Sequence, residues 1–470
     1  MATVSKNLFW QTVAAFLQIY TGGVIFILLA KMLPIEEFGM LSFGFSFATL
    51  LATCLDFGQS LMIMKDYPQK LFKPAAYVLN SMAQKLVLIL FFGGAFLLYL
   101  LSFYEGAWLA IGRLFILFAI LSAYILYLQA LLRIKNRFKD SAFSIIMYAI
   151  LVSIAVGLIY LERISVIQFI WGLILCRLSQ LFVTLVLCKD IFVRNWYSSK
   201  IQKHLFKYSW SYGAHFIFGT FYFTVDTQII ALLLNAKDVA LYQSIFRIVY
   251  IFLIVSDVAS NVLLPYLSSK FALKRSIDEL SSNILYLLLI LGSVLFLFFS
   301  LFYKEIIAIL YTAEYVSAYP LVLPLSIVIL LRTSSSIYGT LLTISNNQVN
   351  RVKIVFLSML TSILLNFLII PLFGIEGSAW TSVLVHVILF SGYQWYTRKD
   401  FPEINLFTWP NIEIATLTLI AVFCGRLMPD QSMLISSLIF IFWIVIVVIL
   451  MKKHQKISIL TQILKDKGVM

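Results

Sequence analysis

The chain has 470 residues, of which 62% are hydrophobic and only 12% are Asp, Glu, Lys or Arg. Soluble domains are about half apolar and a quarter charged, so this composition excludes an ordinary soluble fold. The formal net charge of +14 would suit nucleic acid. No nucleic acid is expected as a partner, however, because the basic residues follow the pattern of membrane topology.

The apolar residues gather in stretches long enough to cross the hydrocarbon core of a bilayer as helices. The first stretch has no small-residue cleavage site behind it, so we predict a retained helix rather than a signal peptide. Arg426 and Pro429 shorten the thirteenth stretch, which leaves twelve spans as an alternative. The sequence predicts an all-α polytopic membrane protein with about 14 transmembrane helices, at roughly 8–30, 38–63, 83–104, 108–132, 141–161, 166–188, 208–235, 240–267, 283–303, 321–345, 351–371, 375–397, 411–427 and 433–451.

The lysines and arginines lie mainly on one predicted side of the membrane. With a cytoplasmic N-terminus, 26 of the 35 lie on the cytoplasmic side, six on the outer side and three inside spans. Lys85 counts here as a residue of the cytoplasmic loop between the second and third spans. The positive-inside rule then predicts that both termini are cytoplasmic and that the number of spans is even.

The sequence shows no sign of a catalytic or metal centre. Its four cysteines all fall in spans, without the spacing of metal ligands or of a disulfide framework. A membrane enzyme that polymerises or ligates glycans generally needs a sizeable outer loop, and no loop of that kind is predicted. We therefore expect no catalytic residues, no metal and no cofactor.

Two pairs of segments indicate an internal repeat. The sequence "LLAKMLPIEEFGML" (28–41) aligns with "IIALLLNAKDVALY" (229–242) at an offset of 201, which also carries Asp56 onto Asp257. The sequence "LLRIKNRFK" (131–139) aligns with "LLTISNNQV" (341–349) at an offset of 210. Repeats at a fixed offset predict two copies of one structural unit.

Each copy would hold six helices and begin on the same side of the membrane, so the copies are parallel. Parallel repeats build transporters with a central cavity between two lobes, near the midplane, and alternating access follows when the lobes rock. The predicted parts are an N-lobe (TM1–6) at 1–190, a cytoplasmic linker at 191–207, a C-lobe (TM7–12) at 208–400, and two extra helices with a cytoplasmic tail at 401–470.

Several stretches resemble a known family. The sequence "LLNFLIIPLFGIEGSAWTSVLVH" (364–386) resembles the Asn…Pro-x-x-Gly-Ile-x-Gly-Ala pattern of polysaccharide flippases, with Ser378 where Ala is usual. Residues 30–43, 238–248 and 304–326 look like their first outer turn, the start of their eighth span and the segment before their tenth. Over roughly residues 1–400 the chain is similar to O-antigen-type flippases, which are polysaccharide transporters of the multidrug/oligosaccharidyl-lipid/polysaccharide exporter superfamily.

This resemblance implies a function in O-antigen and lipopolysaccharide biosynthesis. The substrate would be an undecaprenyl-pyrophosphate-linked oligosaccharide, carried from the cytoplasmic to the periplasmic leaflet of a bacterial inner membrane with H+ or Na+ as coupling ion. Membrane lipids, a glycan polymerase and chain-length proteins are the other expected partners. A lipid II flippase and a drug/cation antiporter of the same superfamily remain alternatives, and an enzyme is disfavoured.

The matching motif has mainly structural roles in this interpretation. We predict that Pro371 ends the eleventh span, while Gly374 and Gly377 permit a tight outer turn and close helix approach. Asn366 belongs to the same motif.

Asp226 and Arg247 are charged residues inside predicted spans, where an ionised group is costly. Each lies about 10 residues from the turn "NAKDV", hence about 15 Å below the outer surface on one helical hairpin. We predict that Arg247 is the partner of Asp226. The Asp226–Arg247 pair would either hold the two helices of the hairpin together, or line a water-filled cavity and titrate there.

Arg177 and Arg332 lie midway along their predicted spans. Together with Arg247 they are predicted to line the cavity, where guanidinium groups suit a pyrophosphate. The alternative is hydrogen bonding between helices.

Three further residues are candidates for ion coupling or gating. Asp56 and Asp257 occupy equivalent places in the two repeats and would bind a cation or latch the lobes, or else have local structural roles. His386 lies one residue from the position equivalent to Arg177, and it is a candidate proton carrier or a packed histidine.

Overall fold

The structure is a computed structural model of the full chain. It describes residues 2–454, with the exception of 67–73, 162–163, 192–198, 273–276, 346, 403, 405 and 428–432. Most of the predicted tail therefore lies outside the described residues, and so does the side chain of Asp257.

The described residues are almost entirely helical and include no strand, as predicted. In lipid, backbone polar groups have no water to bond, so long apolar segments satisfy them within helices. In chain order the α-helices are α1 (Ala2–Ile19), α2 (Ile25–Met32), α3 (Ile35–Asp56), α4 (Gln59–Asp66), α5 (Pro74–Leu88), α6 (Gly94–Phe103), α7 (Gly106–Ile134), α8 (Phe138–Tyr160), α9 (Val166–Leu187), α10 (Ser199–Leu233), α11 (Ala236–Ala272), α12 (Asp278–Leu310), α13 (Tyr319–Ile344), α14 (Gln348–Asp400), α15 (Trp409–Leu427) and α16 (Met433–Lys453).

Within the described ranges, 11 helical segments are long and apolar enough to cross a membrane. The longest, α14, is a single segment that contains two of the predicted spans, whereas α11 and α15 are helices that are not among the 11. The chain is therefore a multi-pass membrane protein, and the count of fourteen spans stays a prediction.

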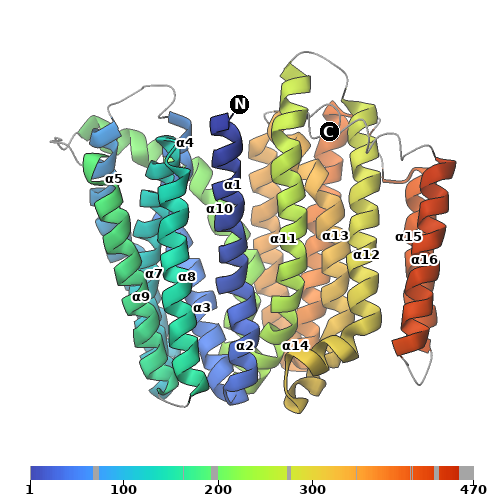
Figure 1. Ribbon diagram of the computed structural model, residues 1–470, viewed down its shortest axis with the longest axis horizontal. Helices are drawn as coiled ribbons and strands as arrows, with labels where there is room; N and C mark the ends of the chain where they lie inside the picture. The colour runs from blue at the N-terminus through green and yellow to red at the C-terminus, as the bar shows by residue number, and fades with distance from the viewer. Residues whose placement is uncertain are drawn as a thin grey trace. The chain divides into compact units, whose positions relative to one another are not determined.

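The helices pack into two compact units (Figure 1). The first unit comprises residues 1–244 and 362–374, and the second comprises 245–361 and 375–470. In the first, α3 packs against α7 and α10, and α8 packs against α9 and α1. In the second, α12 packs against α13, α15 and α16. This division by packing places α10 with the N-terminal helices, whereas the predicted lobes divide at 191–207.

Two groups of polar side chains at helix ends, one in each unit, have the same hydrogen-bond pattern, and we call them corners. In the first unit, Arg137 contacts Asp140 and Asp190, at separations of three and 53 residues. In the second, Asn347 contacts Asn350 and Asp400, again at separations of three and 53. These are corresponding positions under the predicted offset of 210, so the repeat is visible in local geometry at these corners.

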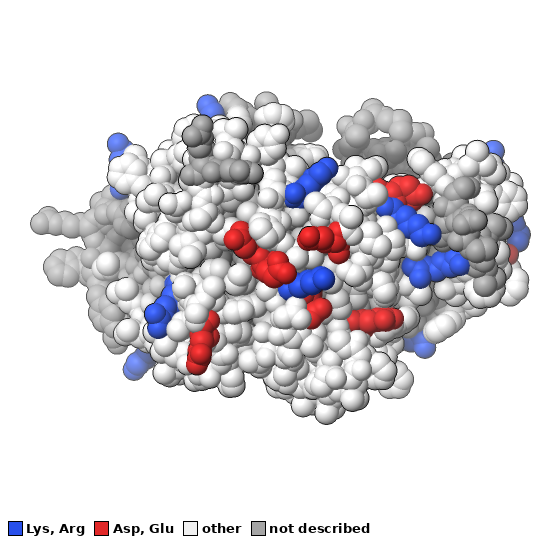
Figure 2. Space-filling model, turned by 90° about the horizontal axis from the view of Figure 1, so that it is seen from below, with Lys and Arg blue, Asp and Glu red and all other residues white. Residues whose placement is uncertain are grey.

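The lower face of the molecule bears few charged side chains. Figure 2 shows acidic and basic side chains standing singly or in small groups among uncharged ones. Glu36 and Glu37 lie in the first turn of α3, and Lys237 and Asp238 in the first turn of α11, at ends that are predicted to face outward.

Breaks in the helices fall at particular residues. Helix α14 is interrupted at Gly374, whose φ of 58° and ψ of −147° are accessible to glycine. Pro371 lies inside the helical segment before this break, so the prediction that Pro371 ends the span is wrong by three residues. Proline frees the carbonyl one turn before it, and in membrane helices neighbouring groups or local adjustments of the backbone satisfy that carbonyl.

Candidate functional site

The carboxylate of Asp226 is buried in the hairpin of α10 and α11, with 3% of the residue exposed. The Tyr242 hydroxyl donates to one carboxylate oxygen, and the Thr227 backbone N–H donates to the other at 2.7 Å. Tyr242 lies on α11 and is fully buried. The predicted pairing with Arg247 is therefore replaced by uncharged donors, because one turn before Arg247 the side chain of Tyr242 already reaches the carboxylate.

Two buried amides, Gln228 and Gln243, lie next to these residues in the sequence. Gln243 donates to the Thr227 hydroxyl, and Gln228 donates to the backbone carbonyl of Phe43 at 3.4 Å. Within the described part of the chain, the side-chain carbonyl oxygens of Gln228 and Gln243 are buried without a hydrogen-bond donor. We call Asp226, Thr227, Gln228, Tyr242 and Gln243 the hairpin network. It concentrates acceptor oxygens inside a predicted membrane span, so it favours a proton or a cation.

Asp56 is buried at the end of α3 and pairs with Lys85. The Lys85 Nζ lies 3.4 Å from Asp56 Oδ1 and donates to the backbone carbonyl of Leu55 at 3.3 Å. The hydroxyl and N–H of Ser60 also donate to the carboxylate. The assignment of Lys85 to a loop is wrong, because it lies fully buried within the segment Val78–Phe103.

Arg177 on α9 packs between aromatic rings. Its guanidinium carbon lies 3.9 Å from the ring centre of Tyr148 and 4.9 Å from that of Phe118. Its Nη1 donates to the side chain of Gln180 at 2.7 Å. Aromatic faces stabilise a guanidinium that has left water. The hydrogen bond to Gln180 stays within α9, so the predicted alternative, hydrogen bonding between helices, is not what the described contacts show. They leave the predicted role in the cavity untested.

Arg332 on α13 and His386 on α14 both lie in the second unit. His386 is buried, and its Nδ1 lies 2.7 Å from the carbonyl of Ser382 one turn earlier. Arg247 lies on α11 in the same unit and is partly buried.

Two residues of the motif, Asn366 and Gly377, are buried. Asn366 is fully buried, and its side chain donates to the carbonyl of Ser362 at 2.8 Å. Gly377 is buried, three residues after the break at Gly374. Asp257 lies on α11, but its side chain is outside the described residues.

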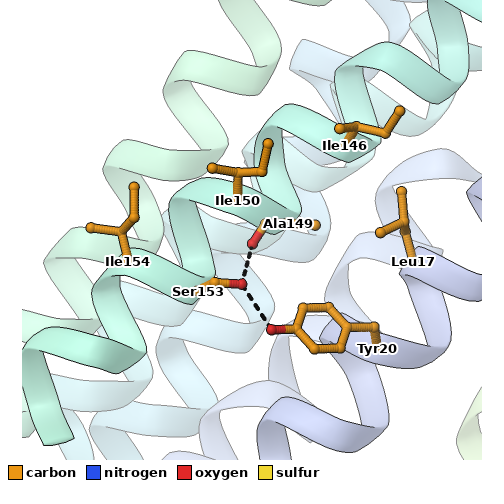
Figure 3. A pocket seen from close by; sticks show the side chains of 7 residues that line it. All are labelled: Leu17, Tyr20, Ile146, Ala149, Ile150, Ser153 and Ile154. Atoms are coloured by element: carbon orange, nitrogen blue, oxygen red, sulfur yellow. Dashed lines mark hydrogen bonds between the residues drawn. The ribbon is translucent and has the colours of Figure 1, made fainter.

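An apolar recess of about 410 Å³ opens on the surface of the first unit, between α1 and α8. Figure 3 shows that the Tyr20 hydroxyl meets that of Ser153, at 2.9 Å, and that Ser153 also bonds the Ala149 carbonyl. Leu17, Ile146, Ile150 and Ile154 supply the apolar walls. Since its few polar groups bond one another, the recess suits a hydrocarbon chain.

The sequence reasoning missed Lys85, Tyr242 and the aromatic partners of Arg177. Only Lys85 carried a signal that was available, since it lies two residues inside the apolar stretch predicted at 83–104. Among the residues that the structure describes, no group of histidine, cysteine and acidic side chains could hold a metal ion.

Comparison with known proteins gives relatives in sequence. A model of the family described as "Polysaccharide biosynthesis protein" matches residues 4–271. The probable low-salt glycan biosynthesis flippase of Haloferax volcanii is 26% identical over 201 residues. That alignment covers 42% of this chain and 43% of the relative, so the chain spans less than half the length of this relative.

Solved structures share the fold at low sequence identity. A lipid II flippase in its inward closed conformation has a TM-score of 0.70 and 13% identity, over 94% of this chain and 98% of that one. A multidrug resistance transporter, inward-facing, has a TM-score of 0.66 and 12% identity, over 83% and 96%. The predicted all-α transporter fold is thereby confirmed.

Proposed function

The chain belongs to the polysaccharide biosynthesis protein family, and from that premise we propose that it flips a lipid-linked oligosaccharide between the leaflets of a membrane. The family and the shared fold indicate a transporter rather than an enzyme. A flippase must let a polar head group cross hydrocarbon, so it needs polar groups within its spans.

One observation supports an anionic head group. Arg177, Arg247 and Arg332 all lie within helices that cross or are predicted to cross the membrane, and all three are only partly buried. Intramembrane arginines usually face a protein interior or a water-filled path. Guanidinium groups bind phosphate oxygens in two-pronged hydrogen bonds, which an ammonium cannot do. In our proposal these arginines bind the pyrophosphate.

The finer assignment follows the resemblance of the sequence. We propose an undecaprenyl-pyrophosphate-linked O-antigen repeat unit as substrate, moved by alternating access across a bacterial inner membrane with both termini cytoplasmic. Asp226, Asp257 and His386 remain the candidates for coupling to H+ or Na+, whereas Asp56 is already paired with Lys85. Of these, Asp226 has only uncharged partners and is best placed to take up an ion.

The prenyl chain need not enter a polar path. The recess between α1 and α8 offers apolar walls at the lipid-facing surface of the first unit. Burial of a hydrocarbon chain there requires no hydrogen-bond partner, because Tyr20 and Ser153 already bond each other. In our proposal the chain stays at this surface while the head group crosses.

A lipid II flippase is the second candidate, since the match in fold spans 94% of the chain. Both substrates are prenyl pyrophosphates, so the arginines do not distinguish them. The two differ in the glycan, and only the phenotype separates them.

A gene deletion in the source organism tests the proposal. Loss of one surface glycan, with its lipid-linked unit trapped in the cytoplasmic leaflet, is the expected result. Lysis with trapped peptidoglycan precursor would establish the lipid II flippase instead. Intact glycans with altered sensitivity to cationic drugs would establish the antiporter.

Complementation of that deletion then tests Arg332. We expect Arg332→Ala to abolish surface glycan while the protein remains in the membrane, since the pyrophosphate loses a cation. Arg113→Ala, in the outer part of α7, is the matched control and should complement. Normal glycan display with Arg332→Ala would remove Arg332 from the site.

A further inference from the structure

The helix that contains Asp56 is broken inside the first unit. Helix α3 ends at Asp56 and α4 begins at Gln59, and the two residues between them have left-handed backbones: φ is 49° at Phe57 and 75° at Gly58. This conformation is rare for a bulky residue such as phenylalanine. A β-carbon on Gly58 would lie 2.7 Å from the Ser209 carbonyl and would overlap the Gly213 nitrogen, so only glycine fits.

The break leaves carbonyl groups at the end of α3 without helical partners. The C-terminal end of a helix also carries partial negative charge, to which Asp56 adds a carboxylate. The oxygens of Leu55 and Asp56 therefore form an electronegative corner away from water. In broken transmembrane helices, unwound carbonyls and half-helix C-termini are where transporters coordinate monovalent cations.

Lys85 reaches this corner from α5. It is fully buried, and its Nζ lies 3.3 Å from Leu55 O and 3.4 Å from Asp56 Oδ1. The ring centre of Tyr127 lies 5.3 Å from the same nitrogen. A carbonyl, a carboxylate and an aromatic face are ligands that an alkali cation also accepts.

Two unsatisfied amides flank the pair in sequence. Gln59 begins α4, three residues after Asp56, and Gln84 precedes Lys85. Each has about 1% of its surface exposed, and neither amide has a hydrogen-bond partner among the described residues. Buried amides are almost always satisfied, so a group of this kind requires an explanation.

We propose that the α3–α4 break is a monovalent-cation site which the chain fills with the ammonium of Lys85. Removal of that side chain leaves a negative, oxygen-lined corner with room for a small ion, and the site then takes Na+ or K+ from solution. In the native chain Asp56 is already neutralised, so this corner takes no inorganic cation. The proposal goes beyond flipping and holds for any substrate.

The test measures the Tm of the purified full chain in detergent, with NaCl, KCl or choline chloride at equal ionic strength. A ligand that binds only the folded state raises Tm in a saturable manner. Lys85→Ala should gain a saturable rise of Tm with Na+ or K+ relative to choline. Asp56→Asn combined with Lys85→Ala should lose it. Lys135→Ala, which removes a partly exposed lysine from its ion pair with Asp190, is the matched control and should respond to the three salts like the wild type.

Two results would overturn the proposal. One is a Lys85→Ala protein with the same Tm in all three salts. The other is a wild-type protein stabilised by Na+ or K+ in a manner that Asp56→Asn abolishes, since the native site would then not be filled. The wild-type measurement still tests the proposal if the Lys85→Ala protein does not fold. Neither readout involves transport, so failure here leaves the proposed flippase function intact.

Discussion

Asp56 and Asp226 lie in the same unit, and both are buried within membrane helices, but their surroundings differ. The Asp56 carboxylate has the ammonium of Lys85 beside it. Among the described residues, the Asp226 carboxylate accepts hydrogen bonds from the Tyr242 hydroxyl and from groups of Thr227. One negative charge is neutralised by the chain itself, whereas the other is stabilised by neutral donors alone.

This difference distinguishes a carboxylate whose charge is permanently paired, Asp56, from one that can exchange a proton or a cation, Asp226. Removing one member of a buried ion pair leaves the other charge without compensation. A carboxylate with neutral donors can instead gain a proton or a cation while its hydroxyl partner stays in place. The comparison therefore assigns a fixed role to Asp56 and a variable one to Asp226.

The repeat supports a special role for the hairpin network. Under the offset of 201, Asp226 corresponds to Ile25, Tyr242 to Leu41 and Gln243 to Ser42. Ile25 and Leu41 are buried apolar residues, and their hairpin, between α2 and α3, folds without a carboxylate. Under the predicted repeat, the corresponding hairpin therefore has apolar residues in place of Asp226 and Tyr242.

The largest expected effect is on the Asp56–Lys85 pair. Lys85→Met fills the space but removes the charge, so Asp56 stays buried and unpaired at a cost of about 3–5 kcal/mol. We expect a strongly lowered Tm and poor accumulation in membranes. Asp56→Asn combined with Lys85→Met should recover most of the loss, and a double variant as unstable as Lys85→Met would show that charge is not the cause.

Gly58→Ala should have the next largest effect. A left-handed backbone costs a non-glycine residue about 1–2 kcal/mol, and the overlap with Gly213 adds overpacking of about 1–3 kcal/mol. Gly22→Ala is the matched control, since its β-carbon would meet nothing within 4 Å. The Tm of Gly58→Ala should fall well below that of Gly22→Ala, and equal values would contradict the close packing at the break.

Tyr242→Phe tests the other aspartate. It removes a hydrogen bond to Asp226, and bonds to charged groups contribute about 1.5–3 kcal/mol. The double variant Asp226→Asn, Tyr242→Phe should lose less stability than the sum of the losses in the two single variants. Strict additivity, measured as Tm in detergent, would mean that the two side chains do not act as a pair.

The smallest effect belongs to the exposed corner at Arg137. Although partial burial opposes it, hydrogen bonds and charges of Lys135 and Arg137 hold the pKa of Asp190 below its ordinary value of 3.8. The stabilisation is therefore present above that pH and is lost as pH falls through the lowered pKa. Asp190→Asn should cost at most about 1 kcal/mol near neutral pH.

The corresponding corner in the second unit is the control for this prediction. There Asn347 replaces the arginine as partner of Asp400. Asp400→Asn should therefore show a weaker dependence on salt than Asp190→Asn. Equal salt dependence of the two Tm changes would show that the arginine adds nothing.

Much of this fold was predictable because lipid leaves few solutions. The apolar stretches predicted the helices. The offset of 210 relates Arg137 to Asn347 and Asp190 to Asp400, and the structure shows the same contact in both places. The partners of the buried charges were not predictable. Equal depth suggested Arg247 for Asp226, but the rotation of the helices decides which side chains meet, and Tyr242 is the one that faces the carboxylate.

Lys85 and Gly374 show a second limit. Lys85 lies at the edge of an apolar stretch, where hydropathy does not distinguish a loop lysine from a buried one. Pro371 suggested the end of a helix, but the helical backbone is interrupted three residues later, at Gly374. In both cases tertiary packing, which one sequence does not display, settled the outcome.

The most direct measurement is flipping by the purified chain in liposomes that contain an undecaprenyl-pyrophosphate oligosaccharide. A glycan-cleaving enzyme added outside reaches only the outer leaflet, so flipping shows as cleavage of the inner pool. We predict that the inner pool is cleaved in the presence of the wild-type chain and stays protected with Arg332→Ala. The contradicting result is an inner pool that the wild-type chain leaves as protected as in protein-free liposomes, while the same chain flips lipid II.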